Sequence, residues 1–215
     1  MQVQYTCDIN YDVFHFMRDN KMTYGFNMAI LEDQRSIPSL WESTAEFVAA
    51  NEGMLDDEAD FSWLLQDAAG EFDQNDHPGA AAHLLMSTLK YNNCQFYSNF
   101  EIGELDFFRG EKHTAFFNHL DKKGEFYYQR LGDAPFHTLS VSLFAPKRKI
   151  WYFRDIGYTH GICQQCPPHT TEPITVTERS DGLADTVDTT TGEPVEQAEA
   201  KVGDKVVEDI AHETA

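Results

Sequence analysis

The sequence predicts an α/β protein with a mixed sheet, and three observations favour this class. Segments with the helical spacing of apolar residues alternate along the chain with short strand-like runs. Aromatic residues make up 13% of the 215 residues, which is enough for a packed core. Beyond Pro167 acidic residues, Thr and Pro dominate and no aromatic residue occurs. We therefore expect a folded part over residues 1–166 and a disordered acidic tail over residues 167–215.

The first three elements follow from capping and periodicity. Asp12 can accept hydrogen bonds from the first N–H groups of a helix that includes Phe14 and Met17. Residues 23–30 alternate between apolar and other side chains, as a strand does. Residues 39–48 place their apolar side chains on one side of a helix.

The later elements are separated by an acidic segment, residues 53–82, which we interpret as a surface excursion around a short helix at 61–65. Residues 95–102 suit a buried strand or the loop at its end. Residues 112–120 and 135–144 predict helices, the second with its proline in the first turn. A short strand is expected at 149–153, and no internal repeat is present.

Charge excludes several classes of partner. The formal net charge of −20 repels phosphate backbones and anionic membrane surfaces. A nucleotide-sugar diphosphate would need a divalent cation to bridge it to so acidic a protein. The first ten residues hold no apolar signal core, and no run approaches the roughly 20 apolar residues of a membrane span.

Four cysteines leave three interpretations open. They are Cys7, Cys94, Cys163 and Cys166, and the last two have C-x-x-C spacing. A zinc site would need further ligands, and the chain has no second C-x-x-C. Structural disulfides in an oxidising lumen, free thiols, and metal or redox chemistry all remain possible interpretations.

Two carboxylates and one histidine stand in three aromatic-rich blocks, a spacing that suits a sugar-handling site built from distant loops. Glu101 lies in an apolar neighbourhood, where a carboxylate is costly unless it is paired or functional. Asp133 precedes a predicted helix, so it is either an N-cap or a ligand of a sugar hydroxyl. His160 is either a structural residue or a ligand of a manganese-like cation. His137 is a weaker metal candidate.

The three blocks are Tyr91–Gly103, Arg130–Pro135 and Arg154–His160, in this order. They resemble the fungal Golgi α-1,2-mannosyltransferases of glycosyltransferase family 15. The resemblance extends over nearly all of residues 3–167. It includes these further motifs: Cys7–Phe14, Lys21–Phe26, Ile37–Trp41, Glu104–Arg109, His119–Asp121 and Cys166–Pro167.

The resemblance implies a GT-A type nucleotide-diphospho-sugar transferase fold, GDP-mannose as donor and Mn²⁺ as cofactor. It also implies retaining transfer that builds α-1,2-linked mannose on O-linked and N-linked glycans of secreted and cell-wall proteins, in the Golgi. By position, Glu101 matches the family's proposed nucleophile and His160 its metal-binding histidine. Tyr97 and Asp133 match positions that line the acceptor and mannose pocket.

The chain also departs from the family pattern. The family commonly has histidine at position 95, tryptophan at 97 and 131, and glutamate at 129; here these are Gln95, Tyr97, Leu131 and Gln129. These changes affect the expected acceptor preference more than the reaction type.

The family also places a Glu-Pro-Asp/Gly metal segment, the GDP-binding elements and a membrane anchor before the residues that resemble Val3–Cys7. We therefore expect this chain to be the C-terminal part of a partial GT-A domain, with apolar surface exposed where the upstream strands would pair. An inert remnant without the donor-binding half is the alternative hypothesis. A third hypothesis is an interaction protein that acts through its acidic tail.

Overall fold

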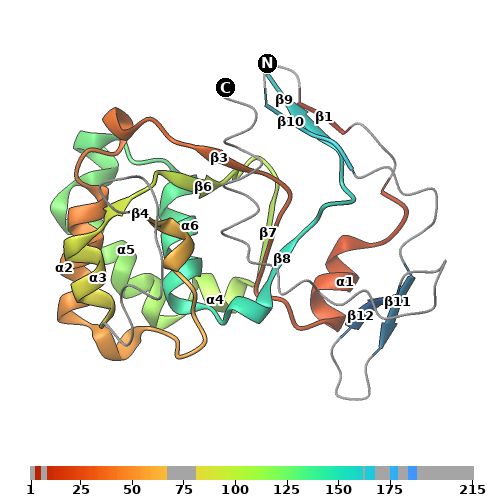
Figure 1. Cartoon of the computed structure of the whole chain (residues 1–215), viewed down its shortest axis with the longest axis horizontal. Helices are drawn as coiled ribbons and strands as arrows, with labels where there is room; N and C mark the ends of the chain where they lie inside the picture. Colours follow the sequence, from red (N-terminus) through yellow and green to blue (C-terminus); the bar gives the residue numbers. More distant parts are fainter. Residues whose placement is uncertain are drawn as a thin grey trace. The chain divides into compact units, whose positions relative to one another are not determined.

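The computed structural model describes residues 3–5, 9–66, 81–161, 163–167, 175–178 and 184–187; of 3, 4, 175–178 and 184–187 it describes the backbone only (Figure 1). The chain divides into two compact units. The central unit is Thr23–Trp151, and the terminal unit joins Met1–Met22 to Tyr152–Ala215. Each unit is described by itself.

The central unit is an α/β structure, which confirms the predicted class. Along the chain its elements are β2 (Tyr24–Phe26), β3 (Ala29–Leu31), η1 (Gln34–Ser36), α2 (Leu40–Ala50), η2 (Glu52–Met54), η3 (Ser62–Leu64), β4 (Leu65–Gln66), α3 (Ala82–Thr88), β5 (Lys90–Tyr91), β6 (Cys94–Phe96), β7 (Glu101–Gly103), α4 (Leu105–Phe108), α5 (Glu111–Lys123), η5 (Glu125–Gln129), α6 (Asp133–Phe144), η6 (Lys147–Lys149) and β8 (Ile150–Tyr152). The last residue of β8 belongs to the terminal unit.

Three of the predicted helices are present in the central unit. The predicted helix at 39–48 is α2, and the one at 112–120 lies inside α5. The one at 135–144 begins two residues early, as α6. Near 61–65 the chain forms the 3₁₀ turn η3 and then the short strand β4, and residues 67–80 of the predicted excursion lie outside the described residues.

The predicted strand at 23–30 is divided into β2 and β3, and the predicted run at 95–102 into β6 and β7. Antiparallel pairing sets Phe26 opposite Glu101 and Ala29 opposite Phe96. Both runs are interrupted at the same level, because residues 97–100 form a turn in which the Phe100 N–H donates to the Tyr97 carbonyl at 3.3 Å. The turn places Glu101 at the beginning of β7, and β2 lies between β7 and β8 in a three-stranded sheet.

The core of the central unit is aromatic. The ring of Phe96 stacks on Phe26 with centroids 4.1 Å apart and on Trp63 at 5.0 Å. Helix α2 packs against α3 and α5, and α6 packs against α5 and β6; Figure 1 shows α2, α3 and α5 grouped together. Phe116 of α5 lies 5.2 Å from Phe47 of α2, ring to ring. Burial of these rings, together with aliphatic side chains such as Leu120 and Leu139, stabilises the unit.

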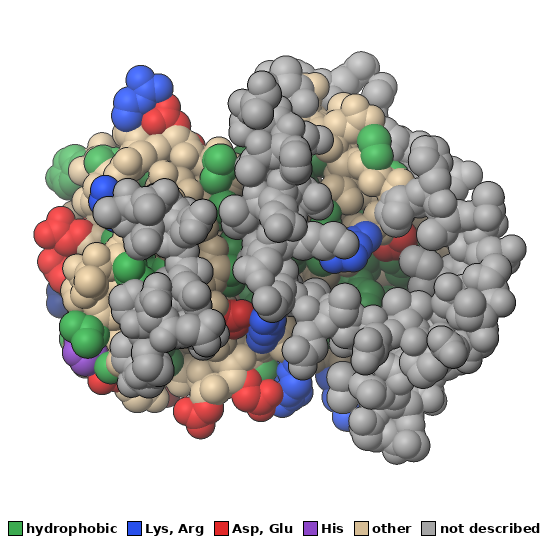
Figure 2. Space-filling model, viewed as in Figure 1, with side chains coloured by type: hydrophobic (Ala, Val, Ile, Leu, Met, Phe, Trp, Pro, Cys, Tyr) green, Lys and Arg blue, Asp and Glu red, His purple; other side chains and the backbone are tan. Residues whose placement is uncertain are grey.

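The surface of the central unit mixes charges of both signs. Figure 2 shows Asp and Glu side chains at separate places on one face, some of them beside Lys or Arg. Ion pairs join Arg148 to Glu58 at 2.6 Å and Lys147 to Asp60 at 2.8 Å. The Arg148–Glu58 pair is exposed, and a pair of this kind contributes little to stability.

The terminal unit contains a short helix and a small sheet. Helix α1 (Val13–Asp19) begins after Asp12, whose carboxylate accepts from the N–H groups of Phe14 and His15 at 2.9 and 3.0 Å, so the predicted N-cap is confirmed. Strands β1 (Val3–Tyr5), β9 (Tyr158–His160) and β10 (Cys163–Gln165) are antiparallel in the order β1-β9-β10.

Only two short strands of the acidic tail are described. They are β11 (Thr175–Glu178) and β12 (Ala184–Val187), which pair antiparallel. The expected disorder of residues 167–215 otherwise concerns residues outside the described part of the chain. Among the described helices, none has the length and apolar character that a membrane crossing requires.

Candidate active site

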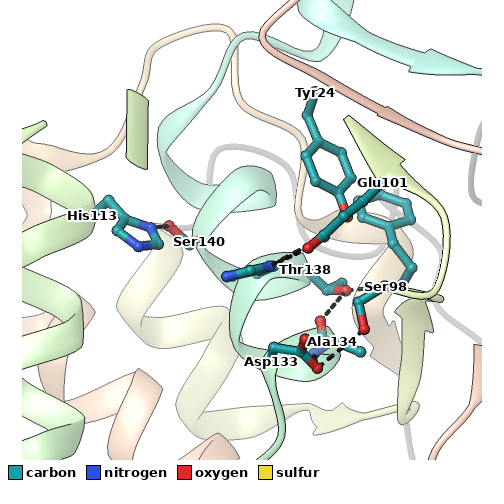
Figure 3. Close-up of polar contacts among 10 residues, drawn as sticks. Tyr24, Ser98, Glu101, His113, Asp133, Ala134, Thr138 and Ser140 are labelled. Atoms are coloured by element: carbon teal, nitrogen blue, oxygen red, sulfur yellow. Dashed lines mark hydrogen bonds and ion pairs between the residues drawn. The ribbon is translucent and has the colours of Figure 1, made fainter. Parts of the chain in front are cut away.

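Glu101, the predicted catalytic carboxylate, is held by two hydrogen-bond donors from different elements. Its Oε2 accepts from the Tyr24 hydroxyl of β2 at 2.8 Å. The Nδ1 atom of His137, on α6, lies 3.1 Å from each of the two carboxylate oxygens. The Glu101 side chain keeps 23% of its surface exposed, so it remains accessible. Figure 3 shows Glu101 beside Tyr24 and above the start of α6.

Tyr24 is a dependable donor because it is fully buried. Burial raises the pKa of its hydroxyl well above the usual value, and the negative charges of Glu101 and Asp133 raise it further. The phenol therefore keeps its proton at every physiological pH. The hydrogen bond from Tyr24 pairs the Glu101 carboxylate at the beginning of β7, which offsets the cost of its apolar neighbourhood.

Asp133 and Tyr97 lie near this carboxylate. Asp133 is the first residue of α6 and is exposed; its Oδ1 accepts from the Ser98 hydroxyl at 3.0 Å and from the Ala134 N–H at 2.9 Å (Figure 3). The N-cap position itself is Gly132, so the predicted cap is displaced by one residue. Tyr97, half-buried, begins the turn that contains Ser98 and donates its N–H to the Met28 carbonyl at 2.8 Å. The turn therefore links Asp133 to Glu101.

His160, the predicted metal ligand, belongs to the terminal unit, whereas Glu101, Asp133 and Tyr97 belong to the central unit. It is half-buried and ends β9, opposite Val3 and Cys163. Within the described ranges of the chain, no group of three or more His, Cys, Asp or Glu side chains could hold a metal ion.

A second histidine lies next to His137. His113 of α5 is 8% exposed, its Nδ1 lies 2.7 Å from the Ser140 hydroxyl, and its ring centroid is 6.2 Å from that of His137. Burial lowers the pKa of His113 to about 4, with a smaller contribution from His137. His113 is therefore neutral at pH 7, which leaves His137 free of a neighbouring positive charge from this side.

A buried carboxylate supports the block that carries Asp133. Glu125 is 3% exposed and accepts hydrogen bonds from the hydroxyls of Ser43 at 2.6 Å and Ser39 at 2.7 Å. It opens the π-helical turn η5, which follows Gly124 with φ of 79°. Its carbonyl accepts from the Leu131 N–H at 3.2 Å. Glu125 thus attaches the turn before Asp133 to helix α2.

Three of the four cysteines are free thiols in the structure, and Cys7 lies outside the described residues. The free-thiol interpretation therefore holds for Cys94, Cys163 and Cys166. Burial raises the pKa of the Cys94 thiol to about 11, which suppresses its reactivity.

Comparison with known proteins agrees with the resemblance in the sequence. Residues 1–184 match the glycolipid 2-alpha-mannosyltransferase family. The chain belongs to this family.

Relatives and solved structures of the family cover most of the chain. It is 42% identical over 161 residues to glycolipid 2-alpha-mannosyltransferase 2 of Candida albicans, which covers 75% of the chain and 31% of the relative. It is 38% identical to alpha-1,2 mannosyltransferase KTR1 of Saccharomyces cerevisiae, over 75% of the chain and 36% of that relative. The crystal structure of core-mannan synthase A from Aspergillus fumigatus, in its Mn/GDP form, is similar with a TM-score of 0.65 and 45% identity, over 77% of the chain and 41% of the structure. The chain thus spans about a third of the length of these curated relatives.

Sequence reasoning alone did not identify the partners of Glu101. His137 follows Asp133 by one turn of α6, and a helix predicted to begin at residue 133 would have placed both side chains on the same face. Tyr24 offered no comparable indication, because its contact with Glu101 joins strands that are 77 residues apart in the sequence. Ser98 and Glu125 were also missed.

Proposed function

We propose that the chain acts in retaining α-1,2-mannosyl transfer from GDP-mannose to mannose-containing O-linked and N-linked glycans of secreted and cell-wall glycoproteins. The observation that carries the proposal is the Glu101 carboxylate, which is partly accessible and oriented by Tyr24 and His137. Family membership and relatives named as mannosyltransferases support it. The proposal includes a GT-A type fold and a Golgi location, as the family resemblance implies.

The reaction assigns a role to each of the three predicted site residues of the central unit, Glu101, Asp133 and Tyr97. A Glu101 oxygen attacks the anomeric carbon of the mannose. The bond between that carbon and the diphosphate oxygen breaks, and the diphosphate leaves with the electron pair. An acceptor hydroxyl then displaces Glu101, and its proton passes to Asp133. Two displacements retain the configuration at the anomeric carbon. Tyr97 supplies a ring on which a sugar can stack.

The manganese that the family resemblance implies would need ligands from the protein. An imidazole is a suitable ligand for this cation, and we propose His160 for that place. The described ranges offer no group of three or more ligating side chains, so the donor diphosphate would have to supply further ligands beside His160. The bound ion would neutralise the diphosphate, which a protein of net charge −20 otherwise repels.

The inert alternative is not favoured. Two donors hold the Glu101 carboxylate in place. Core-mannan synthase A, whose crystal structure is in a Mn/GDP form, is 45% identical to this chain over 77% of its length. An acidic-tail interaction protein has no supporting contact within the described residues.

Mannosyl transfer and nucleotide binding, measured separately, test the proposal. Transfer from GDP-mannose to a mannose acceptor is expected to fall at least roughly 10³-fold in Glu101→Gln, because the carboxylate acts at the transition state. GDP binding, measured by calorimetry, should be almost unchanged. Glu104→Gln is the matched control, since Glu104 is exposed and lies three residues away. Equal losses of turnover and GDP affinity would contradict the role of Glu101.

The metal assignment has its own measurement. GDP is titrated into the chain with and without Mn²⁺, and His160→Ala should weaken only the binding that depends on manganese. His15→Ala, at an exposed histidine of the same unit, is the control. An unchanged manganese dependence in His160→Ala would remove His160 from the ligand set.

A further inference from the structure

We propose that His137 is a positioning residue for Glu101: its Nδ1–H group donates to both carboxylate oxygens and fixes the plane of the carboxylate that faces the sugar. This inference rests on the proposed function, in which Glu101 acts at the anomeric carbon.

The chemistry of the carboxylate assigns the direction of the hydrogen bond. His137 Nδ1 lies 3.1 Å from Oε1 and 3.1 Å from Oε2, so it is centred on the carboxylate. Ionised carboxylate oxygens only accept hydrogen bonds, and the proton must therefore be on Nδ1. Tyr24 donates to Oε2 alone, at 2.8 Å. Donors on β2 and α6 thus hold Glu101 from two elements, with Oε1 the less heavily bonded oxygen.

Aromatic packing holds the imidazole itself. The ring of His137 lies 5.0 Å from Phe108 of α4 and 5.6 Å from Phe136, centroid to centroid, and 22% of its side chain is exposed. The ring of His113 lies 6.2 Å from that of His137, centroid to centroid. His113 is neutral at pH 7, because burial lowers its pKa to about 4. A ring confined in this way loses little additional freedom when it forms the hydrogen bond, so it can define the orientation of its acceptor.

The consequence is a specific kinetic signature. An oxygen held in line with the anomeric carbon lowers the barrier of the displacement, whereas it contributes little to binding of the donor nucleotide. Loss of the Nδ1 donor should therefore lower kcat and leave the KM for GDP-mannose nearly unchanged.

Two substitutions at the same position separate a positioning role from a packing role. Asparagine places an amide N–H near the position of Nδ1, whereas phenylalanine keeps a planar ring without a donor. We expect His137→Phe to lower kcat roughly 10²-fold, and His137→Asn to recover at least about tenfold of that loss. His83→Phe, at an exposed histidine of the same unit, should be neutral. Equal kcat values for the two His137 variants, or a loss expressed in KM, would overturn the proposal.

A second measurement reads the contact without any turnover. In long-range ¹H–¹⁵N spectra of the chain labelled at histidine, His137 should carry its proton on Nδ1 at pH 7, and Glu101→Ala should displace that resonance. An unprotonated Nδ1 at pH 7 would refute the proposed contact. If the chain transfers no mannose, the proposed function fails, and this spectrum still decides whether His137 donates to Glu101.

Discussion

Replacement of Glu125 by alanine should strongly destabilise the central unit. The side chain of Glu125 is almost completely buried, at 3% exposure, and both of its oxygens accept a hydroxyl hydrogen bond. The donors, Ser43 at 2.6 Å and Ser39 at 2.7 Å, lie on or next to α2, more than 80 positions earlier in the sequence. Alanine removes a contact that joins two distant segments.

The magnitude follows from the two bonds and the space left behind. A hydrogen bond to a charged group contributes about 1.5–3 kcal/mol, so two contribute about 3–6 kcal/mol. Part of this gain is offset, because a buried charge carries a desolvation cost that alanine relieves. The truncation also leaves two hydroxyls with reduced bonding. We therefore expect Glu125→Ala to cost about 3–4 kcal/mol, which is a large fraction of the usual stability of a domain.

Equilibrium unfolding in urea measures the effect, with tryptophan fluorescence as the probe. Glu46→Ala is the control, because Glu46 pairs with Lys123 at the surface and its loss should barely move the midpoint. Ser43→Ala combined with Glu125→Ala should cost less than the sum of the single changes, since each of them removes the same Ser43–Glu125 hydrogen bond. A cost below about 1 kcal/mol for Glu125→Ala would refute this account of the buried carboxylate.

Three further predictions use other groups of the structure. Tyr24→Phe should lower kcat for mannosyl transfer by roughly 10–100-fold, since it removes one charge-assisted donor from Glu101; an unchanged kcat would argue against that contact. His113 has a lowered pKa of about 4, so the unfolded chain binds its proton more readily. The contribution of His113 to the free energy of unfolding should be fully present above about pH 6.5. It should be lost as the pH drops toward 4, by at most about 1.4 kcal/mol per pH unit. His113→Gln should flatten this dependence in urea unfolding and His15→Gln should not; equal slopes would contradict the assignment. Cys94 should react with a thiol reagent at least about 100-fold more slowly than exposed Cys166, as followed by peptide mass spectrometry, because burial raises its pKa to about 11; similar rates would contradict its burial.

Helix positions could be predicted from the sequence because their determinants are local. The Asp12 side chain caps α1 within three residues, and the apolar positions of α2 and α5 repeat with the helical period. The start of α6 was placed two residues late, since Pro135 occupies the third helical position rather than the first. Errors of this size arise where a cap is set by backbone geometry alone, as at Gly132.

The strands and the partners of Glu101 depend on distant pairing, which residue spacing does not encode. The run at 23–30 looks continuous, and it is divided because its partner turns at residues 97–100. Glu101 itself could be selected from the sequence by its apolar neighbourhood and by the family resemblance. Its donors could not, because Tyr24 and His137 come from a strand 77 residues earlier and a helix 36 residues later.

Three hydrogen-bonded carboxylates of the central unit, Glu101, Glu125 and Asp133, differ in a way that separates structural from functional roles. Each accepts two or more hydrogen bonds, so bonding alone does not distinguish them. Glu125 is closed off from solvent at 3% exposure, which leaves no approach for a substrate. Asp133 is exposed, and the Glu101 side chain keeps 23% of its surface open while a buried phenol and a packed imidazole orient it. A carboxylate that is both oriented and reachable satisfies the two requirements of a group that acts at an anomeric carbon, and among these three Glu101 meets them best.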